Sequence, residues 1–341
     1  MATGWGGGFF ETSSVESIKA TLQAISPAKW CQIFYALTTA GVLVTASVPR
    51  EARALLADYG ARKAPAPTPE QQGKGQVSPK KQKQKQKQQG QEQDWLVTLV
   101  AAVTSWGQVP HSWFSAFYGL SVGCSLFWLA QFLSGGVVFR TIASLQAGAP
   151  EPSATRVQIT AAWVMLTLQG ARRAYEHAVV MRPSKSTMWF VHWFLGLGFY
   201  LILSVAIWVE GSRALLRGDV GAPDGSSLVK IGVALPAFLF AWVNQYKCHA
   251  HLAGLKKYSL PEEGMFRHLV SPHYTCECLL YLSLSIAAAP EGELVNKTMV
   301  SVLLFVLVNL GLTASGTRQW YADKFGADAV ARKWNMIPFV F

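Results

Sequence analysis

Long stretches without charged side chains restrict the fold of this chain more than any other feature. Four of them contain no Asp, Glu, Lys or Arg, and each is long enough for the roughly 20 residues that a membrane-spanning helix needs: 30–49, 113–139, 188–209 and 298–317. Only 14% of all residues are charged, whereas a soluble domain carries about 25%. The chain is therefore expected to be an integral membrane protein.

Three further apolar stretches are shorter, and each can span a membrane only if it draws neighbouring polar residues to membrane depth: 157–171, 231–246 and 278–290. Polar residues at that depth normally face the interior of a helix bundle or a water-filled cavity, because exposing them to lipid is unfavourable. The sequence thus predicts an all-α protein with seven transmembrane helices and a polar site inside the bundle.

The distribution of basic residues predicts the orientation of these helices. With a lumenal N-terminus and a cytosolic C-terminus, the cytosolic segments hold 22 of the 30 Lys and Arg residues, in agreement with the positive-inside rule. No cleavable signal segment is expected. The predicted organisation is an N-terminal lumenal segment, a first transmembrane helix, a cytosolic loop with an insert, and a region of six helices: 1–29, 30–49, 50–112 with the insert 60–93, and 113–341.

The insert 60–93 is rich in Pro, Gln and Lys, which predicts a disordered, solvated loop and not a nucleic-acid site. The five cysteines form neither a disulfide framework nor a zinc pattern. No metal site, nucleic-acid partner or obligate protein partner is inferred.

Two sets of polar residues at helical spacing could carry chemistry. On one continuous helix Gln245, His249 and Lys256 would line a single stripe, because their rotations differ by only about 20–40°, and His273 and Glu277 would share a face of the next helix. Gln169, Arg173 and Glu176 form a second stripe, whereas Arg172 is expected at the level of the lipid headgroups.

These groups could either satisfy one another and hold the helices together or line a cavity for a polar ligand. Three such groups beside three short helices favour the cavity, and a basic cavity at the cytosolic face suits a phosphate-bearing cofactor. No glycine-rich motif follows a strand, so a Rossmann site is not expected.

Five stretches resemble the steroid 5α-reductase family, in particular its polyprenol (polyprenal) reductase branch. They cover roughly residues 105–341 in the family's order: Val109-Pro110-His111-Ser112-Trp113 through Tyr118, Leu168-Gln169-Gly170 through Glu176, Gln245-Tyr246-Lys247-Cys248-His249, Ser271-Pro272-His273-Tyr274 through Glu277, and Ile337-Pro338-Phe339-Val340-Phe341. The resemblance implies seven transmembrane helices, NADPH as the hydride donor, an α,β-unsaturated lipid substrate and residence in the endoplasmic reticulum membrane, with a role in dolichol synthesis for protein N-glycosylation.

Residue by residue, the resemblance places one set of residues in the NADPH pocket: Arg173, Gln245, His249, Lys256, Tyr258, His273, Glu277 and Tyr321. Steroid-reducing members of the family have a Glu just before the proline and a Tyr three residues before the helix-three Arg. In this chain Gln108 or Val109 stands at the place of the Glu, and Gly170 stands at the place of the Tyr. The departures favour a polyprenyl substrate, with Gln108 on the substrate side.

The chemistry favours polyprenal over polyprenol as the immediate substrate, because hydride adds to an alkene only where the developing negative charge is delocalised. A hydrogen-bond donor must then stabilise an enolate oxygen, and His273 and Tyr274 are the candidates. The alternatives are a 3-oxo-5α-steroid reductase, a trans-2-enoyl-CoA reductase, an isoprenylcysteine-type methyltransferase and a non-enzymatic transporter or scaffold.

Overall fold

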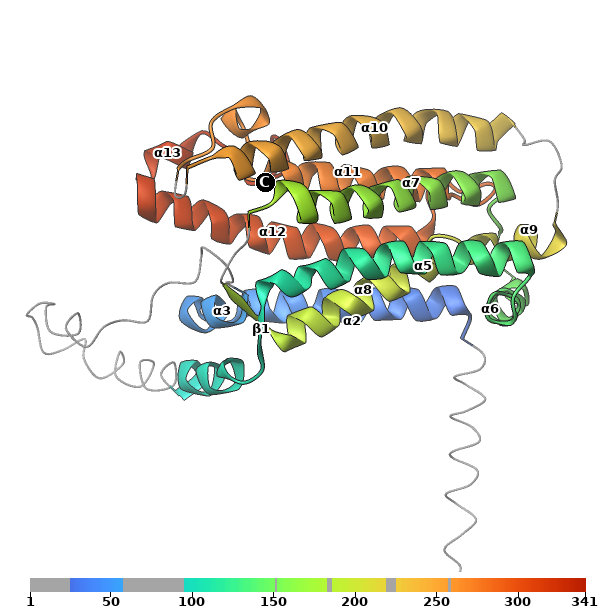
Figure 1. Cartoon of the computed structure of the whole chain (residues 1–341), viewed down its shortest axis with the longest axis horizontal. Coiled ribbons are helices and arrows are strands. Elements are labelled where there is room, and N and C mark those ends of the chain that lie inside the picture. The colour runs from blue at the N-terminus through green and yellow to red at the C-terminus, as the bar shows by residue number, and fades with distance from the viewer. Residues whose placement is uncertain (1–24, 58–94, 151, 183–185, 219–224, 257–258) are drawn as a thin grey trace, which may run out of the picture.

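A computed structural model describes residues 25–57, 95–150, 152–182, 186–218, 225–256 and 259–341. This part of the chain is almost entirely helical, and most of its helices run along the long axis of the molecule (Figure 1). The predicted insert 60–93, most of the predicted N-terminal segment and Tyr258 lie outside the described residues. The all-α fold is confirmed.

Seven helices of 16 or more residues form the bundle in the described part of the chain: α2 (Pro27–Ser47), α5 (Ser115–Ser134), α7 (Arg156–Tyr175), α8 (Phe190–Ala206), α10 (Gly225–Gly254), α11 (Pro272–Ala287) and α12 (Lys297–Phe325). Helix α10 packs on α11, α11 on α12, and α12 on α2. Helix α5 packs against both α7 and α8. The three shorter apolar stretches thus became α7, α10 and α11, each with the polar neighbours that the sequence predicted.

Five helical segments of the described chain are long and apolar enough to cross a membrane: Pro27–Ser47, His111–Ser134, Phe190–Arg217, Gly225–Gly254 and Lys297–Phe325. Helix α7 packs in the same bundle but ends in polar residues, and α11 has only 16 residues. These segments are five candidate spans by length and composition among the described residues, and the number of seven spans stays a prediction.

Two predicted helix boundaries are wrong. The stretch 113–139 does not form one helix, because Gly135 adopts a left-handed backbone (φ 57°) that ends α5. A separate helix, α6 (Val137–Ala147), follows. The stretch that begins at residue 188 starts in a short strand, β2 (Thr187–Trp189), which pairs antiparallel with β1 (Gln108–Pro110).

Short elements connect the bundle helices at its two ends. They are α3 (Arg50–Ala57), a helix over Trp95–Ser105, the 3-10 turns η3 (His111–Phe114), η5 (Val209–Gly211) and η6 (Gly264–Arg267), the π-turn η4 (Glu176–Val180), α9 (Ser212–Arg217) and α13 (Asp328–Ala331). Helices α6 and α9 lie at one end of the bundle, and α13 lies at the other (Figure 1). We refer to these as the α6 end and the α13 end.

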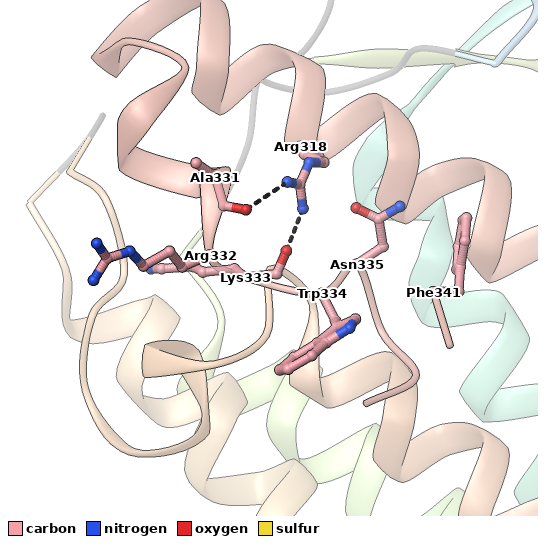
Figure 2. Close-up of a pocket in the computed structure, with 7 residues that line it drawn as sticks. All are labelled: Arg318, Ala331, Arg332, Lys333, Trp334, Asn335 and Phe341. Carbon is pink, nitrogen blue, oxygen red and sulfur yellow. Dashed lines mark hydrogen bonds between the residues drawn. The ribbon is translucent and has the colours of Figure 1, made fainter. Parts of the chain in front are cut away.

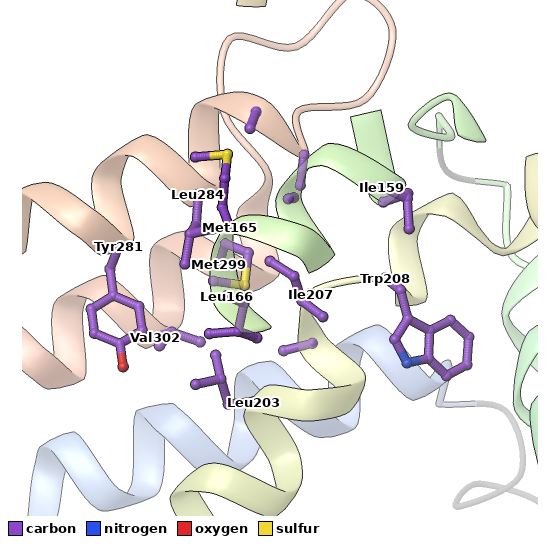
Figure 3. Packing of buried hydrophobic residues seen from close by; sticks show 14 of the residues in the cluster. Ile159, Met165, Leu166, Leu203, Ile207, Trp208, Tyr281, Leu284, Met299 and Val302 are labelled. Carbon is purple, nitrogen blue, oxygen red and sulfur yellow. The ribbon is translucent and has the colours of Figure 1, made fainter. Parts of the chain in front are cut away.

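The centre of the bundle is apolar and closely packed. Leu166 of α7, Leu203 of α8 and Val302 of α12 meet there, as Figure 3 shows. Toward the α6 end, fully buried Trp208 packs against the rings of Trp128 and Phe132, with ring centroids 4.8 and 5.6 Å apart. Some buried polar atoms among the described residues, such as Trp208 Nε1, have no hydrogen-bond partner. Burying a polar group is unfavourable unless it is hydrogen-bonded, so the buried polar side chains of the bundle need a specific account.

Buried polar side chains at the α6 end bind backbone atoms. The Gln158 Nε2 donates to the carbonyls of Ala287 and Ala289, at 3.1 and 2.7 Å. The Glu210 Oε1 accepts a hydrogen bond from the Thr298 backbone N–H at 2.8 Å, in the first turn of α12. These side chains satisfy helix ends that lack partners within the helix, so their role is structural.

Candidate functional site

Four helices and the turn η4 bring polar side chains together in the half of the bundle toward the α13 end. We call this group the polar cluster; its members are Tyr118, Gln169, Arg172, Arg173, Glu176, Gln245, His249 and Glu277. They come from α5, α7, η4, α10 and α11. The two helical stripes predicted from spacing therefore face each other across the bundle.

Two amides and a carboxylate connect α7, α10 and α11. The Gln169 Nε2 donates to Gln245 Oε1 at 3.0 Å and lies 3.4 Å from Glu277 Oε2. The Gln245 Nε2 donates to the same Glu277 oxygen and to the carbonyl of His273, the latter at 3.3 Å. Glu277 is thus held in place by hydrogen bonds from two other helices.

Arg172 belongs to this group, contrary to the prediction that it lies among the lipid headgroups. Its side chain is buried, and its Nη2 donates to Gln169 Oε1 at 2.7 Å and to Gln245 Oε1. Its guanidinium also lies over the Trp242 ring, 5.2 Å from the ring centroid. The prediction was wrong because position 172 faces α10, which hydropathy cannot reveal.

Glu176 is fully buried and faces three basic groups. Its Oε2 accepts from Arg173 and lies 2.7 Å from His249 Nδ1, and its Oε1 lies 3.2 Å from Arg172 Nη1. Burial by itself raises the pKa of Glu176, but the hydrogen bond from His249 and the charges of Arg173 and Arg172 outweigh it and hold the pKa below its ordinary value. The carboxylate is therefore ionised and compensates the buried cations.

Tyr118 joins the cluster from α5. The Arg173 Nη2 donates to the Tyr118 hydroxyl oxygen at 2.7 Å, and the guanidinium carbon lies 5.0 Å from the Tyr118 ring centroid. Sequence reasoning missed this residue, although it closes the first family-like stretch. Only the packing of α5 on α7 brings it to Arg173.

His273 and Tyr274, the predicted catalytic residues, lie at the start of α11 beside the cluster. The His273 ring centroid is 5.5 Å from that of His249 and 4.2 Å from that of Tyr274. The His273 side chain therefore lies close to the predicted cofactor residue His249. Its catalytic or cofactor-binding role stays a prediction.

Three other predicted residues lie away from the cluster. Lys256 is exposed beyond the end of α10 at Gly254, so the expected continuous stripe stops one turn short of it. Gln108 is exposed in β1, where its Nε2 donates to the Thr104 carbonyl at 2.6 Å. Tyr321 of α12 packs with Val270 and Val330, and Tyr258 lies outside the described residues.

A basic pocket opens at the α13 end (Figure 2). It has a volume of about 430 Å³ and is lined by Arg318, Ala331, Arg332, Lys333, Trp334, Asn335 and Phe341. The Arg318 guanidinium donates to the carbonyls of Ala331 and Lys333, and these hydrogen bonds connect α12 to the segment that lines the pocket. Burial lowers the pKa of the Lys333 amine. Sequence reasoning did not predict any of these seven residues as a site.

The chain segment that lines this pocket also borders the start of α11. The Val270 N–H donates to the Trp334 carbonyl at 2.8 Å, and the Ser271 N–H donates to the Asn335 carbonyl at 2.9 Å. His273 follows two residues later. The basic pocket and the polar cluster are therefore linked through the same short segment, although they share no residue.

The sequence of this chain is similar to those of known proteins. Residues 221–341 match the family model described as 3-oxo-5-alpha-steroid 4-dehydrogenase. This part of the chain is therefore similar to the steroid 5α-reductase family. It contains α10, α11, α12 and the basic pocket, whereas Tyr118, Arg173 and Glu176 come from the chain before it.

Relatives that match half or more of the chain bear a more specific name. A polyprenal reductase from Xenopus tropicalis is 28% identical over 257 residues, which cover 69% of this chain and 81% of that protein. The human polyprenal reductase is 27% identical over 260 residues, with 68% and 78% covered. The one from Saccharomyces cerevisiae is 31% identical over 170 residues, with 50% and 60% covered. The chain is therefore similar to proteins named polyprenal reductase over half to about two thirds of its length.

Proposed function

We propose that this protein belongs to the steroid 5α-reductase family and is an NADPH-dependent polyprenal reductase of the endoplasmic reticulum membrane. It would saturate the α-isoprene double bond on the way to dolichol. The observation that carries the proposal is the polar cluster. The half of the bundle toward the α13 end brings together two arginines, two glutamines, a histidine and two carboxylates. Intramembrane groups of this kind are unfavourable unless they serve a site.

NADPH fits the groups at the α13 end. The basic pocket has a volume of about 430 Å³, within the range of roughly 300–1,000 Å³ that is typical of small-molecule sites. Arg318, Arg332 and Lys333 would hold phosphate groups, and Trp334 offers an aromatic face for a base. Gln245 and His249 would hold the part of the cofactor that reaches the polar cluster.

When bound, NADPH supplies the hydride for the β carbon of the substrate. The residues of the chain bind and orient an aldehyde, stabilise the enolate oxygen that develops and exclude bulk water. An allylic alcohol offers no carbonyl to delocalise this charge. The site therefore requires polyprenal, and a separate dehydrogenase must form the aldehyde from polyprenol.

The packing at Gly170 supports a polyprenyl over a steroid substrate. A Cβ atom at this position would lie 2.6 Å from the Ser121 Oγ of α5. A tyrosine, which steroid-reducing relatives have at the matching place, would require Ser121 to move. The close contact between α5 and α7 thus depends on residue 170 having no side chain.

For the membrane arrangement we propose seven spans, with α7 and α11 crossing inside the bundle beside the five apolar segments. The N-terminus would be lumenal and the α13 end cytosolic, where basic residues favour the cytosolic side. This orientation would give the basic pocket access to cytosolic NADPH.

The experiment is a turnover assay with the purified protein in lipid nanodiscs. We expect NADPH oxidation with polyprenal and none with polyprenol, with a 3-oxo-Δ4-steroid or with trans-2-enoyl-CoA. The lipid product should be saturated only in its α-isoprene unit. Direct conversion of polyprenol without a dehydrogenase, or comparable rates with the steroid, would contradict the proposal.

A further inference from the structure

We propose that Tyr118 is the hydrogen-bond donor for the substrate carbonyl oxygen and that Arg173 is the residue that positions it. The inference rests on the proposed function, since it concerns the aldehyde group of that substrate. It assigns to α5 a role that the sequence analysis gave to His273 or Tyr274 of α11.

The hydrogen bond from Arg173 leaves the Tyr118 proton available. The phenol oxygen accepts from Arg173 Nη2 at 2.7 Å, so the hydroxyl hydrogen must point elsewhere. Among the described residues no acceptor binds this hydrogen, although Tyr118 is only 7% exposed. A buried hydroxyl donor without an acceptor is unfavourable unless a ligand or water completes it.

The surroundings fix the direction of the phenol. The Arg173 guanidinium lies over the Tyr118 ring, and the rings of His177 and Tyr200 lie 5.7 and 6.3 Å from it, centroid to centroid. Arg173 itself is held by Glu176. The donor is thus preorganised before the substrate binds, as stabilisation of a developing oxyanion requires.

The helix that carries Tyr118 also faces the membrane, where a prenyl tail must lie. Leu126 and Phe127 of α5 are exposed, as is Trp113 in the turn before it. One turn after Tyr118, Ser121 lies against Gly170 of α7. A lipid aldehyde that approaches along α5 would therefore meet the Tyr118 hydroxyl at the polar cluster.

The proposed step is balanced. The β carbon receives a hydride, with both electrons, from NADPH, and the electrons of the C=C bond move to form the enolate. The Tyr118 hydroxyl hydrogen-bonds to the enolate oxygen and keeps its own proton. A proton from a water molecule reaches the α carbon, which restores the carbonyl, so the products are the saturated aldehyde, NADP⁺ and hydroxide.

The test compares Tyr118→Phe with Tyr35→Phe in the nanodisc assay with polyprenal and NADPH. Tyr35 is a matched control, because its buried phenol donates to the Phe199 carbonyl at 3.0 Å instead of accepting from Arg173. We expect Tyr118→Phe to lower kcat roughly a hundredfold or more, without changing the KM for NADPH. The kinetic isotope effect with deuterated NADPH should rise as the chemical step becomes limiting, and Tyr35→Phe should leave both quantities unchanged.

A kcat for Tyr118→Phe within about twofold of the wild type would overturn the assignment while leaving the proposed function intact. Absence of wild-type turnover would instead overturn the proposed function. If Tyr118→Phe does not fold, 3,5-difluorotyrosine at position 118 keeps the hydroxyl and makes it more acidic. The alkaline limb of the kcat profile should then move to lower pH, and an unchanged profile would refute the role of the phenol.

Discussion

At the α6 end of the bundle, buried Gln158 and Glu210 bind backbone atoms at helix ends, whereas the side chains of the polar cluster bind mainly one another. Gln158 and Gln245 are equally buried, at 1% and 2% exposure. Gln158 donates to two carbonyls at the end of α11, and Gln245 contacts Gln169, Arg172 and Glu277. The same residue type thus completes a helix end in one place and builds a polar network in the other. Burial alone does not identify a site; the kind of partner does.

The largest effect should come from removing the acid of the cluster. Glu176→Ala removes the carboxylate that contacts buried Arg172, Arg173 and His249, which should cost about 3–5 kcal/mol of unfolding free energy. Thermal unfolding of the purified protein in detergent would measure it. The control is Glu293→Ala, which removes a largely exposed pair with Lys297 (2.7 Å) and should cost less than about 1 kcal/mol. Equal losses in the two variants would show that Glu176 is not the centre of the network.

The two glutamines provide a direct test of the comparison. Gln158→Ala should cost roughly 1–3 kcal/mol, because the Ala287 and Ala289 carbonyls each lose a buried hydrogen bond, while the folded fraction keeps its kcat. Gln245→Ala should lower kcat/KM by about 10–100-fold, as loss of a positioning contact does. Both variants need unfolding curves and turnover rates normalised to folded protein. If Gln158→Ala lowered kcat/KM and Gln245→Ala lowered only the stability, the distinction between a structural α6 end and a functional polar cluster would be wrong.

A smaller loss of stability is expected at low pH. Since the pKa of Glu176 is lowered in the folded protein, the ionised carboxylate contributes stability above its ordinary pKa of about 4.5. That contribution is lost as the pH falls through the lower folded pKa. The unfolding temperature of the wild type should therefore decline below about pH 4.5 more steeply than that of Glu176→Gln. If the unfolding temperatures of the two proteins declined in parallel as the pH falls, Glu176 would not be the carboxylate whose pKa is lowered by folding.

The smallest effect is expected from deletion of 71–91, a segment outside the described residues. Its Lys/Gln-rich composition predicts a solvated loop that contributes no packed contacts. Unfolding temperature and turnover should both stay close to wild-type values. Loss of turnover at normal expression would mean that a third region, besides the two ends, is required for function.

Much of the architecture could be predicted from hydropathy and helical spacing. The uncharged stretches located most bundle helices, and the spacing of Gln169, Arg173 and Glu176 correctly grouped them on one face of α7. The same reasoning placed Gln245 and His249 together on α10. It failed at Lys256, because the helix ends before this residue, and at residue 135, where a left-handed glycine ends α5 within an uncharged stretch.

Spacing along one helix determines which side chains share a face, because the α-helical repeat is the same everywhere. It does not determine which other helix that face meets. Arg172 entered the cluster because α10 packs against its side of α7, and Tyr118 reached Arg173 only because α5 packs against α7. The basic pocket likewise depends on the contact of residues 334 and 335 with the start of α11. Contacts between segments far apart in the chain arise from packing the whole bundle, so only the tertiary structure could reveal them.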